Sequence, residues 1–306
     1  MISETISSPR RKQLGDYELD IVVVMFNSWP TVSRELSQML RISRSRSDIH
    51  WIFVDNSLDN GDSNQILERL QGDEHLTLHI SNENTGFAAG SNKGASLGNA
   101  EWLFFLNPDI SITESDLDIV INRLKKEDAD TIAVGQVTRG FAHTGIGVTR
   151  YMWFKDRPSH GRMQLLGPSG GAGVYRRGLF CSHGGFYESL FAWGEDADLA
   201  FRLQKSGATC MPLELRLLHQ GQHSVSDGRK SRAFKARLLT RNRVVVASRN
   251  YSHPKTVCFM AIHMLVLIMR SVENLRRGTL GASFAGYFDG LSFVLNKRLP
   301  IDGRSA

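Results

Sequence analysis

The feature that most constrains the fold is a regular alternation of short apolar runs with segments of helical spacing. Largely apolar runs occupy residues 20–26, 50–54, 76–80 and 102–106, and a stretch that can form a helix follows each of them. Strand and helix thus alternate four times in about 110 residues, a pattern typical of a parallel sheet with right-handed crossovers. The first run is continuously apolar, as central parallel strands are. The sequence therefore predicts an α/β fold.

The expected helices and the later elements are less regular. Helical spacing marks residues 31–42, 61–70, 88–97 and 116–126, and residues 131–137 can form a further strand. Residues 141–161 have no clear period, and a long irregular stretch inside a domain is often functional. We expect further helices at 199–206, 231–249 and 254–294.

Composition narrows the class of protein. A hydrophobic content of 41% in 306 residues suffices for one large core. The net charge of +6 favours anionic partners without choosing among them. Three widely spaced cysteines without a CxxC argue against a disulfide framework or a zinc ribbon, and suit a reducing compartment. The aromatic residues are not interleaved with the basic ones, so we expect no nucleic-acid partner.

Polar side chains stand where the predicted strands end. Asn27 follows the first strand, Asp55 ends the second, and Asn107 follows the fourth. Ligands of open α/β sheets bind at the carboxyl ends of strands, which makes these residues candidates for one site. Asp55 could accept a proton from a base or a ribose, although an aspartate in a turn or a helix cap explains this position as well. No GxGxxG follows the first strand, which argues against a dinucleotide-binding enzyme.

The segment after the third strand, residues 82–94, is rich in glycine and opens a helix. Glycine lets backbone come close to a ligand, and a helix N-terminus favours anions. The segment lacks the GxxxxGK[ST] pattern and is therefore no P-loop.

Asp109 follows the apolar run Trp102–Leu106 and the pair Asn107-Pro108. A carboxylate there is costly to bury unless it binds something, often a metal ion, although Asn-Pro-Asp is also good turn chemistry. A hard divalent ion that bridges a pyrophosphate needs only one or two protein carboxylates, because phosphates and water supply the other ligands. His219 becomes a candidate ligand if it faces Asp109.

An acidic cluster opens the helix expected near residue 199. Glu195, Asp196 and Asp198 directly follow Phe191 and Trp193. Acids in a first turn complement the helix dipole. Apolar neighbours would instead raise the pKa of a carboxylate and suit it to general-base catalysis. Both readings remain open from the residues alone.

Together these segments resemble the inverting glycosyltransferases of family 2, and within them the bacterial rhamnosyltransferases and galactofuranosyltransferase-like enzymes. The likeness covers about residues 18–225 and rests on six strings in the family's order: Val23–Asn27, Val54–Ser57, Asn84–Gly94, Phe105–Asp109, Gly170–Arg177 and Gly194–Arg202. The resemblance implies the GT-A fold, a Rossmann-like, mostly parallel sheet flanked by helices, here with a C-terminal helical extension.

The resemblance also implies roles for single residues at the donor end. Phe26, Asn27 and Asp55 would line the nucleotide base and ribose, while Asn84 and Gly86 would approach the diphosphate. Two further donor-binding residues would be Lys93 and Asn107.

By the same resemblance Asp109 would be the acidic ligand of Mg²⁺ or Mn²⁺, and His219 would match a metal-binding histidine. The commoner Asp-x-Asp pattern is altered, since Asn107 replaces its first acid. Asn107 can still orient water or ribose, but the loss of one charge weakens the expected metal affinity.

The acidic cluster would carry the chemistry. Asp196 would be the general base, Glu195 would hold an acceptor hydroxyl, Trp193 would offer a stacking face for a sugar, and Gly171 would lie at the acceptor. The implied reaction is an inverting transfer, best matched by L-rhamnose from dTDP-rhamnose to a glycan or lipid-linked acceptor in cell-surface polysaccharide synthesis. The alternatives are a galactofuranosyl- or other hexosyltransferase that uses a UDP-sugar, and a noncatalytic module that binds nucleotide sugars or membranes.

We therefore expect three parts: a flexible tail at 1–18, a GT-A catalytic domain at 19–228, and a basic and apolar helical region at 229–306. From residue 229 to 249 there are eight Lys or Arg and no Asp or Glu. A basic segment beside apolar helices suits an interfacial anchor on an anionic leaflet, although ordinary packing explains it too. No stretch is long enough to span a bilayer. We expect a cytoplasmic protein that is peripheral at the inner face of the cell membrane, with a homodimer left open.

Overall fold

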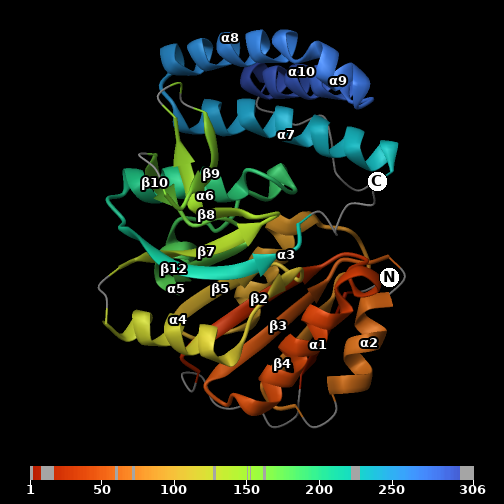
Figure 1. Ribbon diagram of the computed structural model, residues 1–306, viewed down its shortest axis with the longest axis vertical. Helices are drawn as coiled ribbons and strands as arrows, with labels where there is room; N and C mark the ends of the chain where they lie inside the picture. The colour runs from red at the N-terminus through yellow and green to blue at the C-terminus, as the bar shows by residue number, and fades with distance from the viewer. Residues whose placement is uncertain are drawn as a thin grey trace.

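The computed structural model describes residues 3–7, 17–58, 61–70, 73–126, 129–149, 151, 153–160, 163–221 and 228–296. Within these residues a twelve-stranded sheet forms the centre of the molecule, and a layer of C-terminal helices lies at one end of it (Figure 1). The α/β fold with a C-terminal helical region is thus confirmed.

The first half of the sheet is parallel. Its strands are ordered β4 (Leu76–Ile80), β3 (Ile49–Asp55), β2 (Leu19–Met25) and β5 (Trp102–Leu106). All four lie where the apolar runs predict them, and every residue in them is buried. Their carboxyl ends meet at one edge of the sheet, which is the edge where ligands bind in such folds.

The second half is mixed rather than parallel. β11 (Ala172–Arg176) runs antiparallel between β5 and β7 (Thr131–Thr138). β12 (Cys210–His219) is parallel to β7 and antiparallel to the short β6 (Ile110–Ser111). "Mostly parallel" therefore describes the first half only. No strand was expected from the sequence at β11 or β12, so the antiparallel part of the sheet was missed.

Residues 141–161, which show no period in the sequence, contain two strands. β8 (Phe141–Val148) pairs with β7, with β9 (Phe154–Pro158) and with β10 (Gln164–Gly167). A register shift between His143 and Ile146 interrupts the β8–β9 pairing. Such an irregularity breaks the alternation of inward and outward side chains, which explains why no period is visible.

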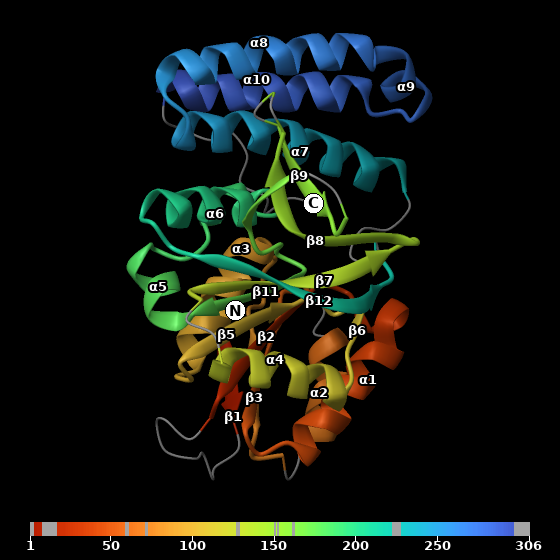
Figure 2. The same ribbon diagram turned by 60° about the vertical axis from the view of Figure 1, so that its left-hand side comes forward.

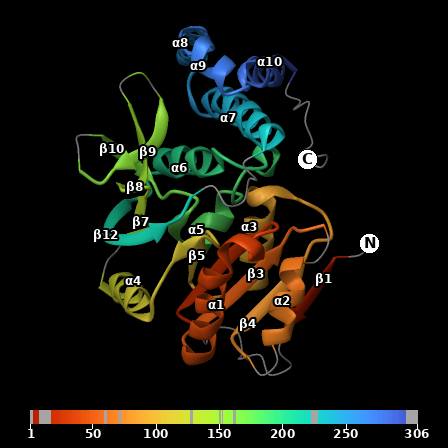
Figure 3. The same cartoon turned by 45° about the vertical axis from the view of Figure 1, so that its right-hand side comes forward.

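Helices cover both faces of the sheet, as the alternating side chains of the strands require. Ile21 and Val23 of β2 belong to a core with α1 (Trp29–Ser45), α2 (Gly61–Leu70) and α4 (Glu114–Lys126). Val22 and Val24 face the opposite core, formed with α3 (Gly86–Leu97), α5 (Arg177–Ser182) and α6 (Glu195–Lys205). Figure 3 shows α1 and α2 together on one side of the parallel strands.

The tail expected at residues 1–18 is partly structured, which corrects that prediction. β1 (Glu4–Ser7) adds an antiparallel edge strand to β4, with Glu4 opposite Ile80. Tyr17 is buried and stacks on His50 with the ring centroids 5.1 Å apart. The reason is that an exposed sheet edge offers unpaired backbone groups even to a short polar segment. Residues 1–2 and 8–16 lie outside the described residues.

The C-terminal region consists of α7 (Arg229–Asn250), α8 (His253–Met269), α9 (Ser271–Arg276) and α10 (Leu280–Asn296). α8 and α10 lie side by side over α7 (Figure 2). Gly286 and Gly290 bring α10 close to α7, because an added Cβ at either position would meet α7 backbone or Val244. α7 itself is buried against α6 through Val245 and Val246.

α7 is therefore an integral part of the molecule rather than the basic surface anchor that its sequence suggests. Arg241 is fully buried, Arg237 pairs with Asp289, and Arg249 pairs with Asp198. Ordinary packing, the alternative left open by the sequence, accounts for these three cations. Among the described residues, no helix combines the length and apolar character needed to cross a bilayer.

Candidate active site

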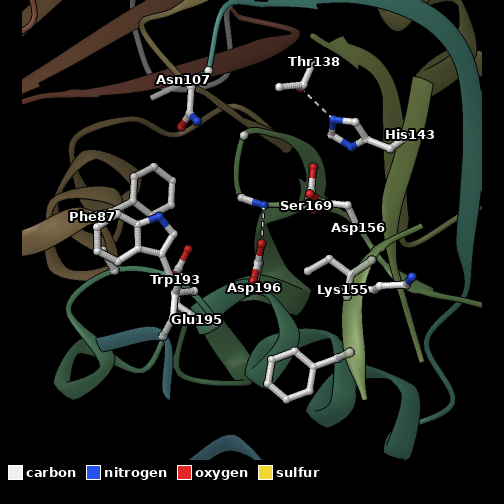
Figure 4. A pocket seen from close by; sticks show the side chains of 18 of the residues that line it. Phe87, Asn107, Thr138, His143, Lys155, Asp156, Ser169, Trp193, Glu195 and Asp196 are labelled. Atoms are coloured by element: carbon white, nitrogen blue, oxygen red, sulfur yellow. Dashed lines mark hydrogen bonds between the residues drawn. The ribbon is translucent and has the colours of Figure 1, made fainter. Parts of the chain in front are cut away.

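A cavity of about 530 Å³ lies at the carboxyl end of β5 and β7. Its walls come from the loop 168–171, from the loop 191–195, from β8 and β9, and from one face of α7. Figure 4 shows Asn107, Thr138 and His143 on one side, with Trp193, Glu195 and Asp196 opposite. Segments more than 100 residues apart in the chain thus converge on one space.

Asp196 is one of three carboxylates that line this cavity, together with Asp156 and Glu195. The Gly170 N–H donates to its Oδ2 at 2.8 Å, and the Ala197 N–H donates to its Oδ1 at 2.7 Å (Figure 4). These two bonds fix the orientation of the carboxylate and favour its ionised form. Burial has the larger, opposite effect and raises the pKa of Asp196 to about 6. A carboxylate of that pKa is suited to accept a proton near neutral pH.

Glu195 lies beside Asp196 in a different environment. It is 4% exposed, and its Oε2 has no hydrogen-bond partner in the described part of the chain. Burial, together with the charge of Asp196, raises the pKa of Glu195 well above its usual range. The raised pKa favours the protonated form of Glu195, and a buried carboxylic acid can donate a hydrogen bond into the cavity.

The loop in front of these acids has an unusual backbone. Phe191, Trp193 and Gly194 have φ values of +68°, +65° and +106°. Asn242 of α7 holds this loop, because its Nδ2 donates to the carbonyl oxygens of Leu190, Ala192 and Trp193 at 2.9, 2.8 and 2.7 Å. The orientation of Trp193 and the start of α6 thus depend on a side chain from the C-terminal region.

Asp109 and His219 face each other, as the metal-site hypothesis requires. His219 Nε2 lies 3.2 Å from Asp109 Oδ1, and the Gly221 N–H donates to Asp109 Oδ2 at 3.0 Å. Thr138 Oγ1 lies 3.2 Å from His219 Nδ1 and 2.9 Å from His143 Nε2, which fixes the histidine ring. His219 lines the cavity together with Asp196, while Asp109 lies directly behind His219.

This pair fits a divalent cation with few protein ligands. Two ligands held at about 2.1 Å and at right angles around one ion are about 3 Å apart, close to the separation seen here. The described residues contain no group of three or more His, Cys, Asp or Glu that could hold a metal. A cation at this pair would therefore take its remaining ligands from a diphosphate and water. Asn107 lines the cavity nearby and could orient such water.

The predicted base- and ribose-binding residues lie at the same sheet edge but outside the cavity lining. Phe26 is partly exposed and Asn27 is exposed at the end of β2. Asp55 is fully buried and already bonded: it accepts from the Ser57 N–H at 2.8 Å, from the Ser63 N–H at 2.7 Å and from the Ser63 hydroxyl. Asp55 thus has the turn and helix-cap geometry that the sequence left as an alternative.

Backbone contacts hold the glycine-rich segment, residues 82–94, in position. The Asn84 Oδ1 accepts from the Gly86 N–H at 3.1 Å, and Gly86, at φ +81°, packs so closely on Phe191 that a Cβ would collide with it. Gly86 therefore couples this segment to the loop of Trp193. Lys93 is not brought to the cavity. It lies on the outer side of α3 in a separate hollow that His79 and other residues line.

Several cavity residues escaped the sequence reasoning. Gln136, Ser169 and Gly170 lie beside the predicted Gly171, with Gln136 Nε2 donating to Ser169 Oγ at 2.8 Å. Gln136 and Thr138 are polar residues two apart at the end of an apolar strand, a signal that could have revealed them. No sequence signal distinguishes Lys235 and Arg243, because both lie in a helix with many other Lys and Arg residues.

Comparison with known proteins shows the family of the chain. The sequence profile of Glycosyl transferase family 2 matches residues 20–183, more than half of the chain. The chain belongs to glycosyltransferase family 2. The matched region includes Asp55, Asn107, Asp109 and Gly171, and ends before the acid pair.

Curated relatives of this family 2 member are distant. A cholesterol galactosyltransferase of Borreliella burgdorferi is 23% identical over 116 residues, which are 38% of this chain and 32% of that protein. A poly(ribitol-phosphate) beta-N-acetylglucosaminyltransferase, TarP, of Staphylococcus aureus is 26% identical over 117 residues, 38% of this chain and 35% of that protein. The matches span about a third of the length of these relatives.

Solved structures of glycosyltransferases share the fold. A mannosyltransferase from Pyrobaculum calidifontis in complex with GDP-Man and Mn²⁺ has a TM-score of 0.55 at 13% identity, covering 93% of this chain and 90% of that one. TarS 1–349 of S. aureus has a TM-score of 0.52 at 13% identity, covering 93% and 94%. These structural matches cover 93% of the chain, so they extend well beyond residue 183 and include C-terminal elements.

Proposed function

We propose that the protein is an inverting glycosyltransferase in which Asp196 is the general base. The observation that carries this proposal is the Asp196 carboxylate itself, which faces the cavity, is oriented by two backbone N–H groups and has a pKa raised to about 6. Family membership supports the reaction class.

An inverting transfer needs one base on the face opposite the leaving group and no covalent intermediate. The acceptor oxygen would attack the anomeric carbon, the bond from that carbon to the diphosphate oxygen would break, and Asp196 would take the hydroxyl proton. Protonated Glu195 would hold the acceptor by a hydrogen bond, and Trp193 would offer its ring to the sugar. A side chain at position 170 would press on both acids, because a Cβ on Gly170 would lie 3.0 Å from Glu195 Oε1 and 3.3 Å from Asp196 Oδ2.

The donor would be a nucleoside diphosphate sugar bound between the strand ends and the Asp109–His219 pair. Phe26, Asn27 and Asn84 lie at that sheet edge and would contact the nucleotide. A Mg²⁺ or Mn²⁺ ion held by Asp109 and His219 would neutralise charge on the departing diphosphate. The mannosyltransferase with GDP-Man and Mn²⁺ supports a donor and metal of this kind.

For the transferred sugar we propose L-rhamnose from dTDP-rhamnose, with a galactofuranosyl or other hexosyl group from a UDP-sugar as the alternative. Thymine and uracil present the same imide edge, so the base alone does not separate them. The acceptor would be a glycan or a lipid-linked glycan of the cell surface. The poly(ribitol-phosphate) transferase among the relatives supports a cell-surface polymer.

We further propose that the layer of α8, α9 and α10 binds an anionic membrane surface. Large apolar side chains are exposed on it, namely Val257, Leu265, Ile268, Met269, Val272, Leu275, Phe288 and Leu295. Lys255, Arg270, Arg276 and Arg277 border them. Apolar side chains beside cations suit an anionic interface. The protein should sediment with phosphatidylglycerol vesicles at low salt and be released at high salt, and absence from the pellet at both salt concentrations would refute this.

The test of the catalytic proposal combines binding with turnover. Nucleoside diphosphates and nucleotide sugars, among them dTDP-rhamnose, UDP-galactofuranose and GDP-mannose, are screened by thermal shift with and without Mn²⁺, since a ligand of the native state raises the melting temperature. Release of nucleoside diphosphate then measures transfer. Asp196→Asn should bind the donor normally and lose transfer by about 10²–10⁴-fold. Near-normal turnover in Asp196→Asn would remove Asp196 as the base.

The matched control is Glu214→Gln, which removes a carboxylate from an exposed position on β12. It should bind and turn over the donor like the wild type. If both the wild type and Glu214→Gln bind donors without turnover, the protein is instead a noncatalytic nucleotide-sugar module.

A further inference from the structure

One face of α7 lines the cavity with Lys235, Leu239 and Arg243. Residues four apart lie on the same side of a helix, and a rise of 1.5 Å per residue separates Lys235 from Arg243 by about 12 Å along the axis. Burial and the charge of Arg139 lower the pKa of Lys235, while Asp156 and Asp109 raise it, and the ammonium group packs over the Trp193 ring at 5.1 Å. Asp109 acts on Lys235 but not on Arg243, so Lys235 lies toward the donor end of the cavity and Arg243 lies farther from it.

Arg243 has an aromatic platform. Its guanidinium carbon lies 4.6 Å from the centroid of the Trp153 ring. The Trp153 ring is held in turn by two side chains of α8, Phe259 at 5.7 Å and His263 at 5.0 Å between centroids. Burial lowers the pKa of Arg243 to about 10, so the group is still charged at neutral pH.

The charge of Arg243 lacks a counter-ion within the described part of the chain. Neighbouring arginines on the same helix are paired, Arg237 with Asp289 at 2.7 Å and Arg249 with Asp198 at 2.9 Å. Arg243 has neither an ion pair nor a side-chain hydrogen bond there, and the charge that acts on its pKa, after burial, is that of another cation, Arg270. Removing an unpaired cation from water is costly, and stacking on tryptophan offsets only part of that cost.

We propose that Arg243 and Trp153 form an acceptor subsite and that the acceptor carries an oxyanion, a phosphate or a carboxylate. The inference rests on the proposed function and names the substrate class of the same cavity. A guanidinium fork binds either oxyanion through two parallel hydrogen bonds. The diphosphate of the donor would occupy the Asp109–His219 end, so the anion at Arg243 belongs to the second substrate. Asp196 lines the same cavity and would meet a hydroxyl of that substrate.

The experiment measures anion binding with the donor end filled. The full-length protein is saturated with Mn²⁺ and UDP, or with Mn²⁺ and dTDP, and titrated separately with inorganic phosphate and with glucuronate by calorimetry. Three proteins are compared: the wild type, Arg243→Met, and the control Lys230→Met, which removes a cation from an exposed position of the same helix. Unfolding temperatures without ligand establish that all three are folded, and Arg243→Lys replaces the methionine variant if that protein fails to fold.

The wild type and Lys230→Met should bind one of the two anions alike, and the Arg243 variant should bind it at least about tenfold more weakly. Tighter binding of phosphate would indicate a phosphorylated acceptor, and tighter binding of glucuronate a uronic-acid acceptor. Equal binding by wild type and Arg243 variant, or no binding of either anion, would overturn the inference. If neither nucleotide binds, the proposed dTDP- or UDP-sugar donor is excluded, while the comparison of Arg243 with Lys230 still decides the anion subsite.

Discussion

Asn242 gives the sharpest test of how the active-site loop is held. The prediction is that Asn242→Ala lowers both stability and transfer. The Asn242 amide has two hydrogens and faces three carbonyl oxygens of the loop, those of Leu190, Ala192 and Trp193. Two hydrogen bonds contribute about 1 kcal/mol each, and leaving a buried carbonyl unsatisfied costs at least about 1 kcal/mol, so the loss is at least about 3 kcal/mol.

The loop cannot be expected to keep its shape without these bonds. Phe191 and Trp193 are non-glycine residues at positive φ, and such conformations cost about 1–3 kcal/mol each. The strain is therefore as large as the stabilisation that Asn242 supplies. On its loss the loop should relax, and because α6 begins at Glu195 directly after Gly194, Asp196 should move with it. A displacement of about 1 Å suffices for a hundredfold loss of rate.

The assay has two readouts. Urea unfolding should show a free energy of unfolding lower by about 3 kcal/mol in Asn242→Ala, and nucleoside diphosphate release should fall by at least about tenfold. Thr240→Val is the matched control, since Thr240 is buried on the same helix but donates only to Ala236 O within it. An Asn242→Ala protein as stable and as active as Thr240→Val would refute the reasoning.

Three further predictions follow from the site. Because burial raises the pKa of Asp196 to about 6, and only the ionised carboxylate accepts a proton, kcat/KM should be flat above that pH and fall about tenfold per unit below it; a profile flat down to pH 4.5 would contradict this. Asp55→Asn should lower the free energy of unfolding by about 2 kcal/mol, since the carboxylate caps α2 through Ser63; unchanged stability with lost nucleotide binding would favour a direct ligand role. Asp109→Asn should raise the Mn²⁺ concentration needed for half-maximal activity at least about tenfold, with the His219→Gln variant behaving alike; equal metal dependence in wild type and both variants would exclude the pair as ligands.

The sequence predicted the parallel half of the sheet well, because β2 to β5 are buried on both faces and therefore consist almost entirely of apolar residues. It also placed Asp196 and Glu195 at a helix start, and the structure meets the condition under which His219 became a candidate ligand, since His219 faces Asp109. The direction of a strand is not encoded in its apolar content, and no strand was expected at β11, so its antiparallel pairing was not foreseen. β1 escaped because an edge strand of four residues has no apolar pattern.

The cavity wall from α7 could not be predicted for a different reason. Lys235, Arg237, Arg241 and Arg243 look alike in sequence, yet one is paired, one is fully buried and two line the cavity. The face of the helix on which a cation lies decides whether it is paired, buried or exposed to the cavity. α7 lacks a marked apolar stripe that would reveal the orientation of the helix. Asp55 is the opposite case. Its position at a strand end suggested that it binds a nucleotide, whereas its bonds to Ser63 are those of a helix cap.

The placement of α7 has a consequence for how such an enzyme can change its acceptor. One helix supplies both the amide that shapes the catalytic loop and the cation that selects the second substrate, at Asn242 and Arg243, which are adjacent in sequence. Neighbouring helical positions point about 100° apart, so substitutions at 243 alter selectivity without disturbing the loop. Exchanging the whole helix between homologues would instead alter both at once, and engineering of new acceptors should begin with point changes along the 235–239–243 row.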